Sequence, residues 1–328
     1  MSDMEYRRLG LSGLAVSVVG LGCNNFGLRI DSKASQRVVG AALDHGVNLF
    51  DTSDIYGHGG AGAGTSEEQL GAALGSRRNE AIIATKFGVS LDGLNGPDWD
   101  ARGSRRYVKD AADASLRRLS TDWIDLYQVH FPDLMTPIDE TLSALDDLVH
   151  EGKVRYLGCS NFTAAQIVHA DWVAKTSGFE RFISVQDQYN LLHRAPEEEV
   201  IPWCSKLGLG FLPYYPLASG LLTGKYRRGE AAPDGSRLQD DSDGFLHDAN
   251  WSAIADLEDF ASSQDLSMLD VAIGGLAAMP GVSSVIAGAT RPEQVALNVE
   301  ASQWKPSTED LLRLSDITTP EQTSSVGQ

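Results

Sequence analysis

Residues 33–53, KASQRVVGAALDHGVNLFDTS, decide the fold class, because they combine an amphipathic helix with a buried strand that follows it directly. Apolar residues gather on one side of the expected helix 33–45, and Gly46 is typical of a helix end. The expected strand 48–53 is apolar up to Asp51, as in a parallel strand that is covered on both faces. The stretch therefore predicts one repeat of an α/β protein with a parallel sheet.

The same repeat recurs along the whole chain. Further strands are expected at residues 16–23, 81–87, 123–130, 154–161, 182–188, 210–217 and 283–289. Further helices are expected from residue 65 and over 137–151, 164–175, 196–207, 251–263 and 292–301. Eight strands that alternate with helices predict a closed (β/α)8 TIM barrel, and a doubly wound sheet is the alternative.

Several segments lie outside this repeat. A hairpin is expected over 5–19, before or overlapping the first strand. Residues 88–104 and 218–247 are long for connections and predict long loops at the C-terminal face, where barrels carry their active sites. We expect residues 1–317 to form a single barrel domain that ends in an extra helix, and 318–328 to be a disordered tail.

The composition limits the possible partners. The chain has 328 residues, with 27 Lys+Arg and 45 Asp+Glu, so its net charge is −18. This charge argues against binding to nucleic acid or an anionic membrane, but it leaves open a small anionic ligand in a local pocket. With no signal peptide, no membrane-length apolar run and only three scattered cysteines, we expect a cytoplasmic protein. The oligomeric state stays open.

Polar residues end several of the expected strands. Asp51, Lys86 and His130 end three consecutive strands, and Ser160, Asn161 and Gln186 end the next two. Because the carboxyl ends of barrel strands meet at one mouth, these side chains are expected to lie close together. Packing does not explain three successive buried strands that end in ionisable residues.

Tyr56 follows Asp51 by five residues and completes a group suited to proton transfer. A free tyrosine has a pKa of about 10, and a nearby lysine ammonium would lower it. Asp51 would keep Lys86 charged and oriented, and His130 would orient a carbonyl group. The set predicts proton delivery from Tyr56 to a carbonyl oxygen during its reduction.

Asp51, Tyr56, Lys86 and His130 resemble, in order, spacing and context, the catalytic tetrad of the aldo-keto reductase superfamily. The similarity extends over nearly the whole chain, through GVNLFDTSDIYG (46–57), TKFG (85–88), LYQVH (126–130), GCSNF (158–162), VQDQYNL (185–191), YYPL (214–217) and residues 286–298. The resemblance implies a carbonyl reductase with a small-molecule substrate and a nicotinamide cofactor, NADP(H) in preference to NAD(H).

The resemblance also implies which residues hold the cofactor. Ser160, Asn161 and Gln186 would hold the carboxamide, and Tyr214 would stack on the nicotinamide ring. The pyrophosphate would lie along Leu217, Ser219, Gly220, Leu221, Thr223 and Lys225, and the adenosine end along Gly288, Ala289, Thr290, Arg291, Gln294 and Asn298. Lys225 and Arg291 are the cations expected to offset the acidic chain, Arg291 at the start of a helix.

The chain departs from the family pattern at three places. Gly288-Ala289 stands where better-known members have Lys-Ser, which removes one ligand for a 2′-phosphate. Tyr215 replaces a small residue, and segment 57–65 is longer and richer in glycine than usual. Within it, GHGGAG (57–62) fits a dinucleotide-binding motif, but no acidic strand end follows about 20 residues later, so we expect a flexible loop.

The substrate pocket is expected to include Asn24, Asn25, Phe26, Trp99 and Phe131, which lie at or beyond strand ends. The two asparagines favour a hydroxylated substrate such as a keto sugar or an aldose. No spacing typical of a metal site is present. A nicotinamide-bound sensor or channel-accessory subunit with little turnover is the main alternative function, and a barrel hydrolase without a cofactor is a third.

Overall fold

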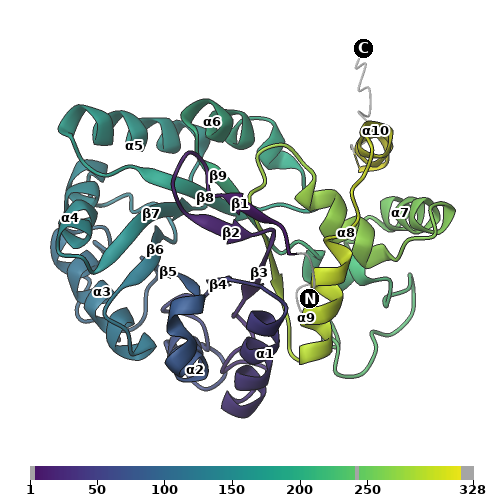
Figure 1. Cartoon of the computed structure of the whole chain (residues 1–328), viewed down its shortest axis with the longest axis horizontal. Helices are drawn as coiled ribbons and strands as arrows, with labels where there is room; N and C mark the ends of the chain where they lie inside the picture. Colours follow the sequence, from purple (N-terminus) through teal and green to yellow (C-terminus); the bar gives the residue numbers. More distant parts are fainter. Residues whose placement is uncertain (1–3, 241–243, 319–328) are drawn as a thin grey trace.

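The computed structural model describes residues 4–240 and 244–318. Eight parallel strands form one sheet in the order β10-β3-β4-β5-β6-β7-β8-β9 (Figure 1). These strands are β3 (Val19–Gly22), β4 (Leu49–Asp51), β5 (Ile82–Phe87), β6 (Ile124–Val129), β7 (Val154–Ser160), β8 (Phe182–Gln188), β9 (Gly210–Tyr214) and β10 (Val285–Gly288). Phe211 of β9 forms a parallel bridge with Val282 just before β10. This bridge closes the sheet, and the predicted TIM barrel is confirmed.

Helices surround the strands (Figure 1). They are α1 (Ser32–Asp44), α2 (Thr65–Leu74), α3 (Arg105–Leu119), α4 (Ile138–His150), α5 (Ala164–Ser177), α6 (Val200–Leu207), α7 (Trp251–Ser263), α8 (Met268–Ala277), α9 (Pro292–Ala301) and α10 (Thr308–Thr318). Three short 3-10 helices accompany them, η1 (Gly75–Glu80), η2 (Ala195–Glu197) and η3 (Ala218–Thr223). The helix expected over 196–207 is thus split between η2 and α6.

Two of these helices, α3 and α8, are absent from the sequence-based prediction. The buried side of α3 combines Tyr107, Val108 and Leu119 with small residues, but charged residues make up so much of the helix that its average hydrophobicity is low. In α8 every residue except Leu269 and Asp270 is buried, and two adjacent glycines lower its helix propensity. A Cβ at Gly274 would lie 2.7 Å from the carbonyl oxygen of Ala301. Close packing against the end of α9 therefore requires glycine at this position.

The N-terminal hairpin pairs β1 (Tyr6–Arg8) with β2 (Ala15–Ser17) in antiparallel fashion. Leu9 and Val16 are fully buried and pack with Leu49, Leu126 and other side chains of the barrel interior. The hairpin therefore covers the N-terminal end of the barrel, and the opposite end, where the strands terminate, stays open to ligands.

The glycine-rich segment 57–64 is a compact turn rather than the flexible loop that the sequence suggested. Ala61 donates a backbone hydrogen bond to Gly27 at 2.7 Å, and Gly62 donates one to Gly57 at 3.0 Å. Cβ atoms at Gly57 and Gly60 would lie within 2.4 Å of backbone oxygens. The glycines allow two stretches of backbone to pack directly together.

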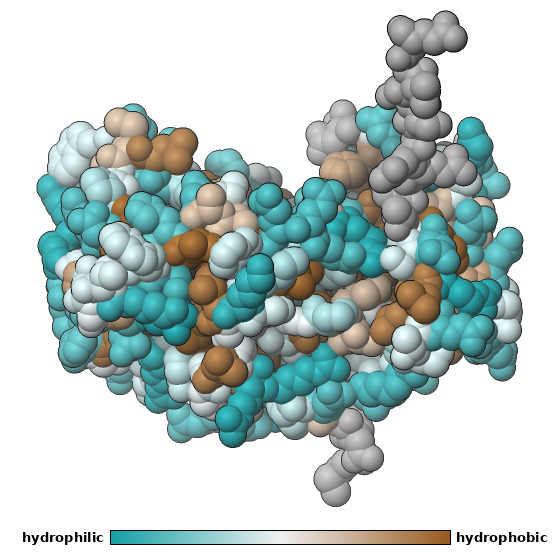
Figure 2. All heavy atoms as spheres, turned by 90° about the horizontal axis from the view of Figure 1, so that it is seen from above, coloured by the Kyte–Doolittle hydropathy of each residue, from teal (hydrophilic) through white to brown (hydrophobic). Residues whose placement is uncertain are grey.

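The surface is mostly hydrophilic, as Figure 2 shows for one face, with apolar residues scattered among polar ones. None of the helices among the described residues is long and apolar enough to cross a bilayer. Thr318 is the last residue of α10, and the rest of the expected tail lies outside the described residues. That residues 1–317 fold as a single domain stays a prediction.

Candidate active site

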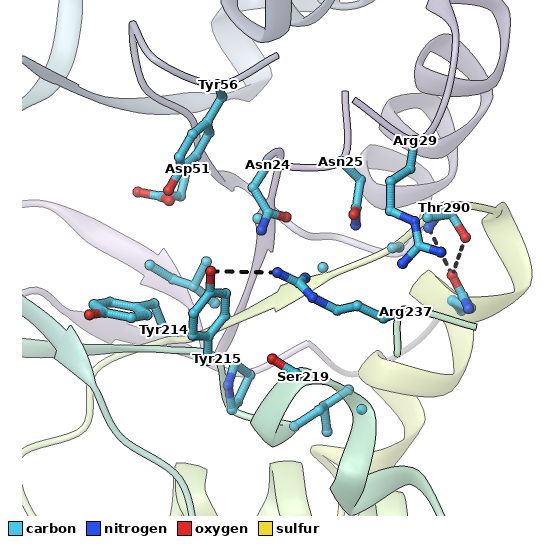
Figure 3. A pocket seen from close by; sticks show the side chains of 18 of the residues that line it. Asn24, Asn25, Arg29, Asp51, Tyr56, Tyr214, Tyr215, Ser219, Arg237 and Thr290 are labelled. Carbon is cyan, nitrogen blue, oxygen red and sulfur yellow. Dashed lines mark hydrogen bonds between the residues drawn. The ribbon is translucent and has the colours of Figure 1, made fainter. Parts of the chain in front are cut away.

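The carboxyl ends of the barrel strands surround a cavity of about 660 Å³, a volume within the usual range for small-molecule sites. Its wall contains Asp51, His130, Ser160 and Gln186 from four of the strand ends. The strand-end residues expected to meet at one mouth therefore do so, with Lys86 directly behind this wall. Figure 3 shows Asp51 and Tyr56 beside one another at one side of the cavity.

Asp51, Lys86 and Tyr56 form one hydrogen-bonded group. The fully buried Lys86 Nζ donates to Asp51 Oδ2 at 2.6 Å and Oδ1 at 2.7 Å, and to the backbone oxygen of Thr52 at 3.0 Å. Its hydrogen bond to the Tyr56 hydroxyl is longer, at 3.3 Å. The ammonium is thus bound mainly to the carboxylate, and the hydroxyl of Tyr56 is its fourth and most distant hydrogen-bond partner.

This arrangement changes the expected electrostatics of Tyr56. The sequence suggested that Lys86 would lower the pKa of this tyrosine. In the structure, burial raises the pKa of Tyr56 well above its usual value, and the negative charge of Asp51 adds to the effect. Lys86 does not lower the pKa of Tyr56 as expected, because its positive charge is largely balanced by Asp51. Tyr56 consequently keeps its proton at neutral pH.

His130 lies in the same wall of the cavity as a neutral imidazole. Burial, with the nearby positive charge of Lys86 as a further cause, lowers the pKa of His130 to about 3. Its Nδ1 is 3.1 Å from Ser53 Oγ, and its ring lies edge-on to that of Tyr56, with centroids 6.2 Å apart. The ring nitrogen facing away from Ser53, Nε2, is therefore the one available to a molecule in the cavity.

A chain of amide and hydroxyl groups continues the wall beyond His130. Asn161 Nδ2 donates to the backbone oxygen of His130 at 2.9 Å and to Ser160 Oγ at 3.0 Å, and its Oδ1 accepts from the Tyr214 hydroxyl at 2.8 Å. Gln186 Nε2 donates to Asp51 Oδ1 at 2.8 Å. These bonds hold the polar groups in place before any ligand arrives.

The chain turns sharply after β9. Tyr215, Ala218 and Ser219 all have positive φ angles, of 51°, 46° and 58°, which side-chain-bearing residues seldom adopt. Gly220 follows with φ of 100°. Such concentrated backbone strain is found where a chain must fit closely around a ligand, and this turn borders the cavity (Figure 3).

Most of the residues predicted to hold a cofactor line this one cavity. They are Ser160, Asn161, Gln186, Tyr214, Leu217, Ser219, Gly220, Thr223, Lys225, Gly288, Ala289, Thr290 and Gln294. Leu221 packs in the hydrophobic core instead, Asn298 is buried in α9, and Arg291 lies exposed just before α9 outside the lining.

The substrate-pocket prediction divides in a similar way. Asn24, Asn25 and Phe131 line the cavity. Phe26 does not, because it is fully buried in the core, and Trp99 does not, because it lies on the surface with Arg106 stacked over its ring at 4.7 Å. Position just beyond a strand end was therefore not sufficient to place a side chain in the cavity.

The sequence-based prediction missed two cations of the cavity wall, Arg29 and Arg237. Arg237 extends across the cavity to Tyr215 (Figure 3), with its guanidinium 5.1 Å from the ring centroid. Arg29 donates to the backbone oxygens of Gly235 and Ser236 at 3.2 and 3.1 Å. These bonds connect the segment after β3 with the segment that carries Arg237. Both come from loops without a periodic pattern, so no signal in the sequence indicated them.

Comparison with known proteins agrees with this geometry. Residues 18–318 match the aldo/keto reductase family. The chain is 36% identical to the oxidoreductase YrpG of Bacillus subtilis, covering 96% of both chains. It is also 36% identical to a protein of Arabidopsis thaliana named as a probable voltage-gated potassium channel beta subunit, covering 91% of both.

A third relative is named for a reaction. The versiconal hemiacetal acetate reductase of Aspergillus parasiticus is 32% identical, over 97% of this chain and 98% of that protein. Family match, relatives and barrel fold all agree along almost the full length. The chain therefore belongs to the aldo-keto reductase family and is an NAD(P)-dependent oxidoreductase.

Proposed function

We propose that this protein reduces an aldehyde or ketone with NADPH, and that Tyr56 is the general acid. The observation that carries the proposal is the Tyr56 hydroxyl in a ligand-sized cavity, 3.3 Å from the ammonium of a buried Lys86–Asp51 ion pair. Such a hydroxyl keeps its proton until negative charge develops on a neighbouring oxygen, and it then donates that proton next to a fixed positive charge.

His130 would orient the substrate. As a neutral imidazole in the cavity wall, it can hydrogen-bond to a carbonyl oxygen without competing for the proton of Tyr56. Lys86 acts behind the tyrosine, since it is fully buried and does not line the cavity, and Asp51 holds the Lys86 ammonium in place. Each of the four residues thus has a separate task in one proton transfer.

The residues around the cavity fit a dinucleotide cofactor, which would supply the hydride. Ser160, Asn161 and Gln186 present polar groups suited to a carboxamide, and Tyr214 presents a ring whose hydroxyl is fixed by Asn161. The strained turn 215–220 and the cations Arg29, Lys225 and Arg237 are suited to phosphates.

The three cations in the lining support NADPH rather than NADH, because the additional phosphate of NADPH needs positive charge nearby. The structure also offers a local reason why a glycine stands at position 288. A Cβ at this position would lie 3.2 Å from Asn25 Nδ2 and 3.6 Å from Asn24 Oδ1. The asparagine pair thus occupies the space that a larger side chain at 288 would need.

The substrate we propose is a hydroxylated carbonyl compound such as a keto sugar or an aldose. Asn24 and Asn25 contribute amide groups to the wall, and Phe131 and Val89 contribute apolar surface. Amides of this kind can hydrogen-bond to substrate hydroxyl groups. The three free cysteines are all buried, which agrees with the cytoplasmic location that we also propose.

Replacement of Tyr56 by Phe tests the proposal. The ring stays in place while the donated proton is lost, so we expect turnover to fall by about 10²–10⁴-fold with NADPH binding retained. NADPH absorbance across a carbonyl panel, run in parallel with NADH, measures turnover, and fluorescence titration measures binding. Tyr156→Phe, on β7 away from the cavity lining, is the matched control. Unchanged turnover in Tyr56→Phe would reject Tyr56 as the acid.

A second candidate function is a nicotinamide-bound sensor or channel-accessory subunit. It is favoured by the relatives named as probable channel beta subunits, 36% and 37% identical to this chain. The complete group of Asp51, Tyr56, Lys86 and His130 favours the reductase. Tight NADPH binding without turnover of any carbonyl in the panel would support the sensor.

A further inference from the structure

A second buried carboxyl group lies directly behind His130. Ser53 Oγ stands between two partners, His130 Nδ1 at 3.1 Å and Asp54 Oδ1 at 3.2 Å. Ser53 and Asp54 are fully buried, and neither lines the cavity. The three side chains form a continuous line from the barrel wall to the imidazole in the cavity.

The oxygen of Asp54 that faces away from Ser53, Oδ2, can only accept a hydrogen bond. Asn95 Oδ1 accepts a hydrogen bond from Arg118 Nη1 at 3.0 Å, and arginine can only donate. This fixes the orientation of the Asn95 amide, so its Nδ2 donates to Asp54 Oδ2 at 2.8 Å. Asp54 Oδ2 is therefore always an acceptor, and a proton on Asp54 must lie on Oδ1, which faces Ser53.

The proton on Asp54 then decides the direction of the whole line. When Asp54 is protonated, its O–H donates to Ser53, the serine hydroxyl donates to His130 Nδ1, and Nε2 carries the imidazole proton. When Asp54 is ionised, Ser53 must donate to the carboxylate, so Nδ1–H donates to Ser53 and Nε2 is left without a proton. Ser53 Oγ also accepts weakly from the backbone N–H of Ile55, at 3.4 Å, and this bond suits both states.

Charged and titratable groups from several elements face this line. Glu67 of α2, Tyr107 and Arg118 of α3, and Tyr127 of β6 lie around Asp54, and Lys86 of β5 and Tyr56 lie near His130. Burial and the charge of Glu67 raise the pKa of Asp54 to about 8, against the opposing effects of Arg118, Ser53 and Asn95. Arg118 is also bound to Glu67, with Nε 2.6 Å from Oε2.

We propose that Asp54 is a positioning residue that acts through Ser53 to decide which ring nitrogen of His130 carries the proton. Protonated Asp54 makes His130 Nε2–H a donor to a carbonyl oxygen, which suits reduction. Ionised Asp54 makes Nε2 an acceptor for an alcohol O–H, which suits oxidation. The link to catalysis rests on the proposed function of His130, whereas the hydrogen-bond reversal does not.

The change between the two states balances in protons. One proton moves from Asp54 Oδ1 to Ser53, the serine proton moves to His130 Nδ1, and the proton on Nε2 is released into the cavity. The net loss is a single proton, and no charged imidazolium is needed at the end states, in agreement with the lowered pKa of His130.

Nitrogen-15 NMR of histidine-labelled protein tests the reversal directly, because it distinguishes the two imidazole tautomers. His130→Asn identifies the signal among the seven histidines. In the wild type we expect Nε2–H at pH 6.5 and Nδ1–H at pH 9.5. Asp54→Asn should keep Nε2–H at both pH values, since the amide N–H replaces the acid proton toward Ser53.

Two further variants sharpen the test. Ser53→Ala interrupts the line and should remove the pH dependence of the tautomer. Asp187→Asn removes a half-buried carboxyl group, also with a raised pKa, that neither lines the cavity nor contacts His130, and should leave the reversal intact. A wild-type tautomer that does not change with pH, or a reversal that persists in Asp54→Asn or Ser53→Ala, would overturn the proposal.

Kinetics provide the second measurement. For ionisation near pH 8, the reductive kcat of the wild type should fall about tenfold between pH 7 and 9, whereas that of Asp54→Asn should change less than about twofold. Turnover that depends on Tyr56 but has the same pH profile in Asp54→Asn overturns only the role of Asp54. Tautomer reversal in a protein without any turnover overturns only the proposed function.

Discussion

Asp51 and Asp54 are buried carboxyl groups three residues apart, yet their surroundings differ. Asp51 receives the Lys86 ammonium on both of its oxygens and a further hydrogen bond from Gln186. Asp54 has the neutral side chains of Ser53 and Asn95 as its hydrogen-bond partners, and its pKa is raised to about 8. The first is one half of an ion pair, and the second keeps its proton at neutral pH.

The difference shows that a partner, rather than the residue type, sets the charge of a buried acid. Arg118 lies near both Asp54 and Glu67, but its guanidinium is bound to Glu67 at 2.6 Å. Asp54 is left with burial and the repulsion of Glu67, both of which favour its neutral form. Removing the cation that pairs with Asp51 should therefore destabilise the protein, whereas replacing Asp54 with a residue that cannot ionise should stabilise it.

The largest effect is expected from Lys86→Met. This change leaves the Asp51 carboxylate buried without its cation, so the free energy of unfolding should fall by about 3–5 kcal/mol. Turnover should fall by at least about 10²-fold, because the hydroxyl of Tyr56 loses its positive neighbour. Urea unfolding and steady-state kinetics measure both quantities.

The double variant Lys86→Met/Asp51→Asn is its control. It removes both charges of the ion pair, so stability should recover in large part while turnover stays low. Equal stability of the single and double variants would contradict the uncompensated-charge explanation.

Asp54→Asn should instead stabilise the protein, by an amount that depends on pH. The unfolded chain ionises Asp54 above its ordinary pKa of 3.8, but the native protein retains the proton up to about pH 8. Wild-type stability is therefore lost as pH rises through this window, at about 1.4 kcal/mol per unit for this one group. The Asp54→Asn variant does not lose this stability as the pH rises, because an asparagine side chain does not ionise.

The stability difference between Asp54→Asn and the wild type is thus expected to be small near pH 4 and to grow to several kcal/mol, on the order of 5 at most, near pH 8. Denaturant unfolding of both proteins across this range measures it. A difference that does not change with pH would show that native Asp54 is ionised, like Asp51.

The smallest effect is expected at the exposed cations of the cavity rim. Arg237→Met should raise the KM for NADPH about tenfold, with kcat nearly unchanged, because one charge-assisted contact to a phosphate is lost. Arg291→Met, outside the cavity lining, should change this KM by no more than about twofold. The two effects should also shrink at high salt. A larger effect at Arg291 than at Arg237 would indicate that the cofactor phosphates bind closer to the start of α9.

The candidate site was predictable where it depends on strand ends. The carboxyl ends of parallel strands meet at one mouth, so Asp51 and His130 could be brought together from their positions alone, with Lys86 close behind. The fate of Phe26 and Trp99 was not predictable in this way, since both lie in irregular segments where no periodicity fixes the side-chain direction.

The sequence by itself determined the (β/α)8 repeat, the family, and the order of the polar strand ends, because these follow from local periodicity and spacing. Tertiary structure decided that Arg29 and Arg237 enter the cavity wall, that α8 forms despite its two glycines, and that Tyr56 and Asp54 keep their protons. The physical reason is that a side chain's solvation and its charged neighbours come from residues distant in the sequence, and only the packed fold sets them.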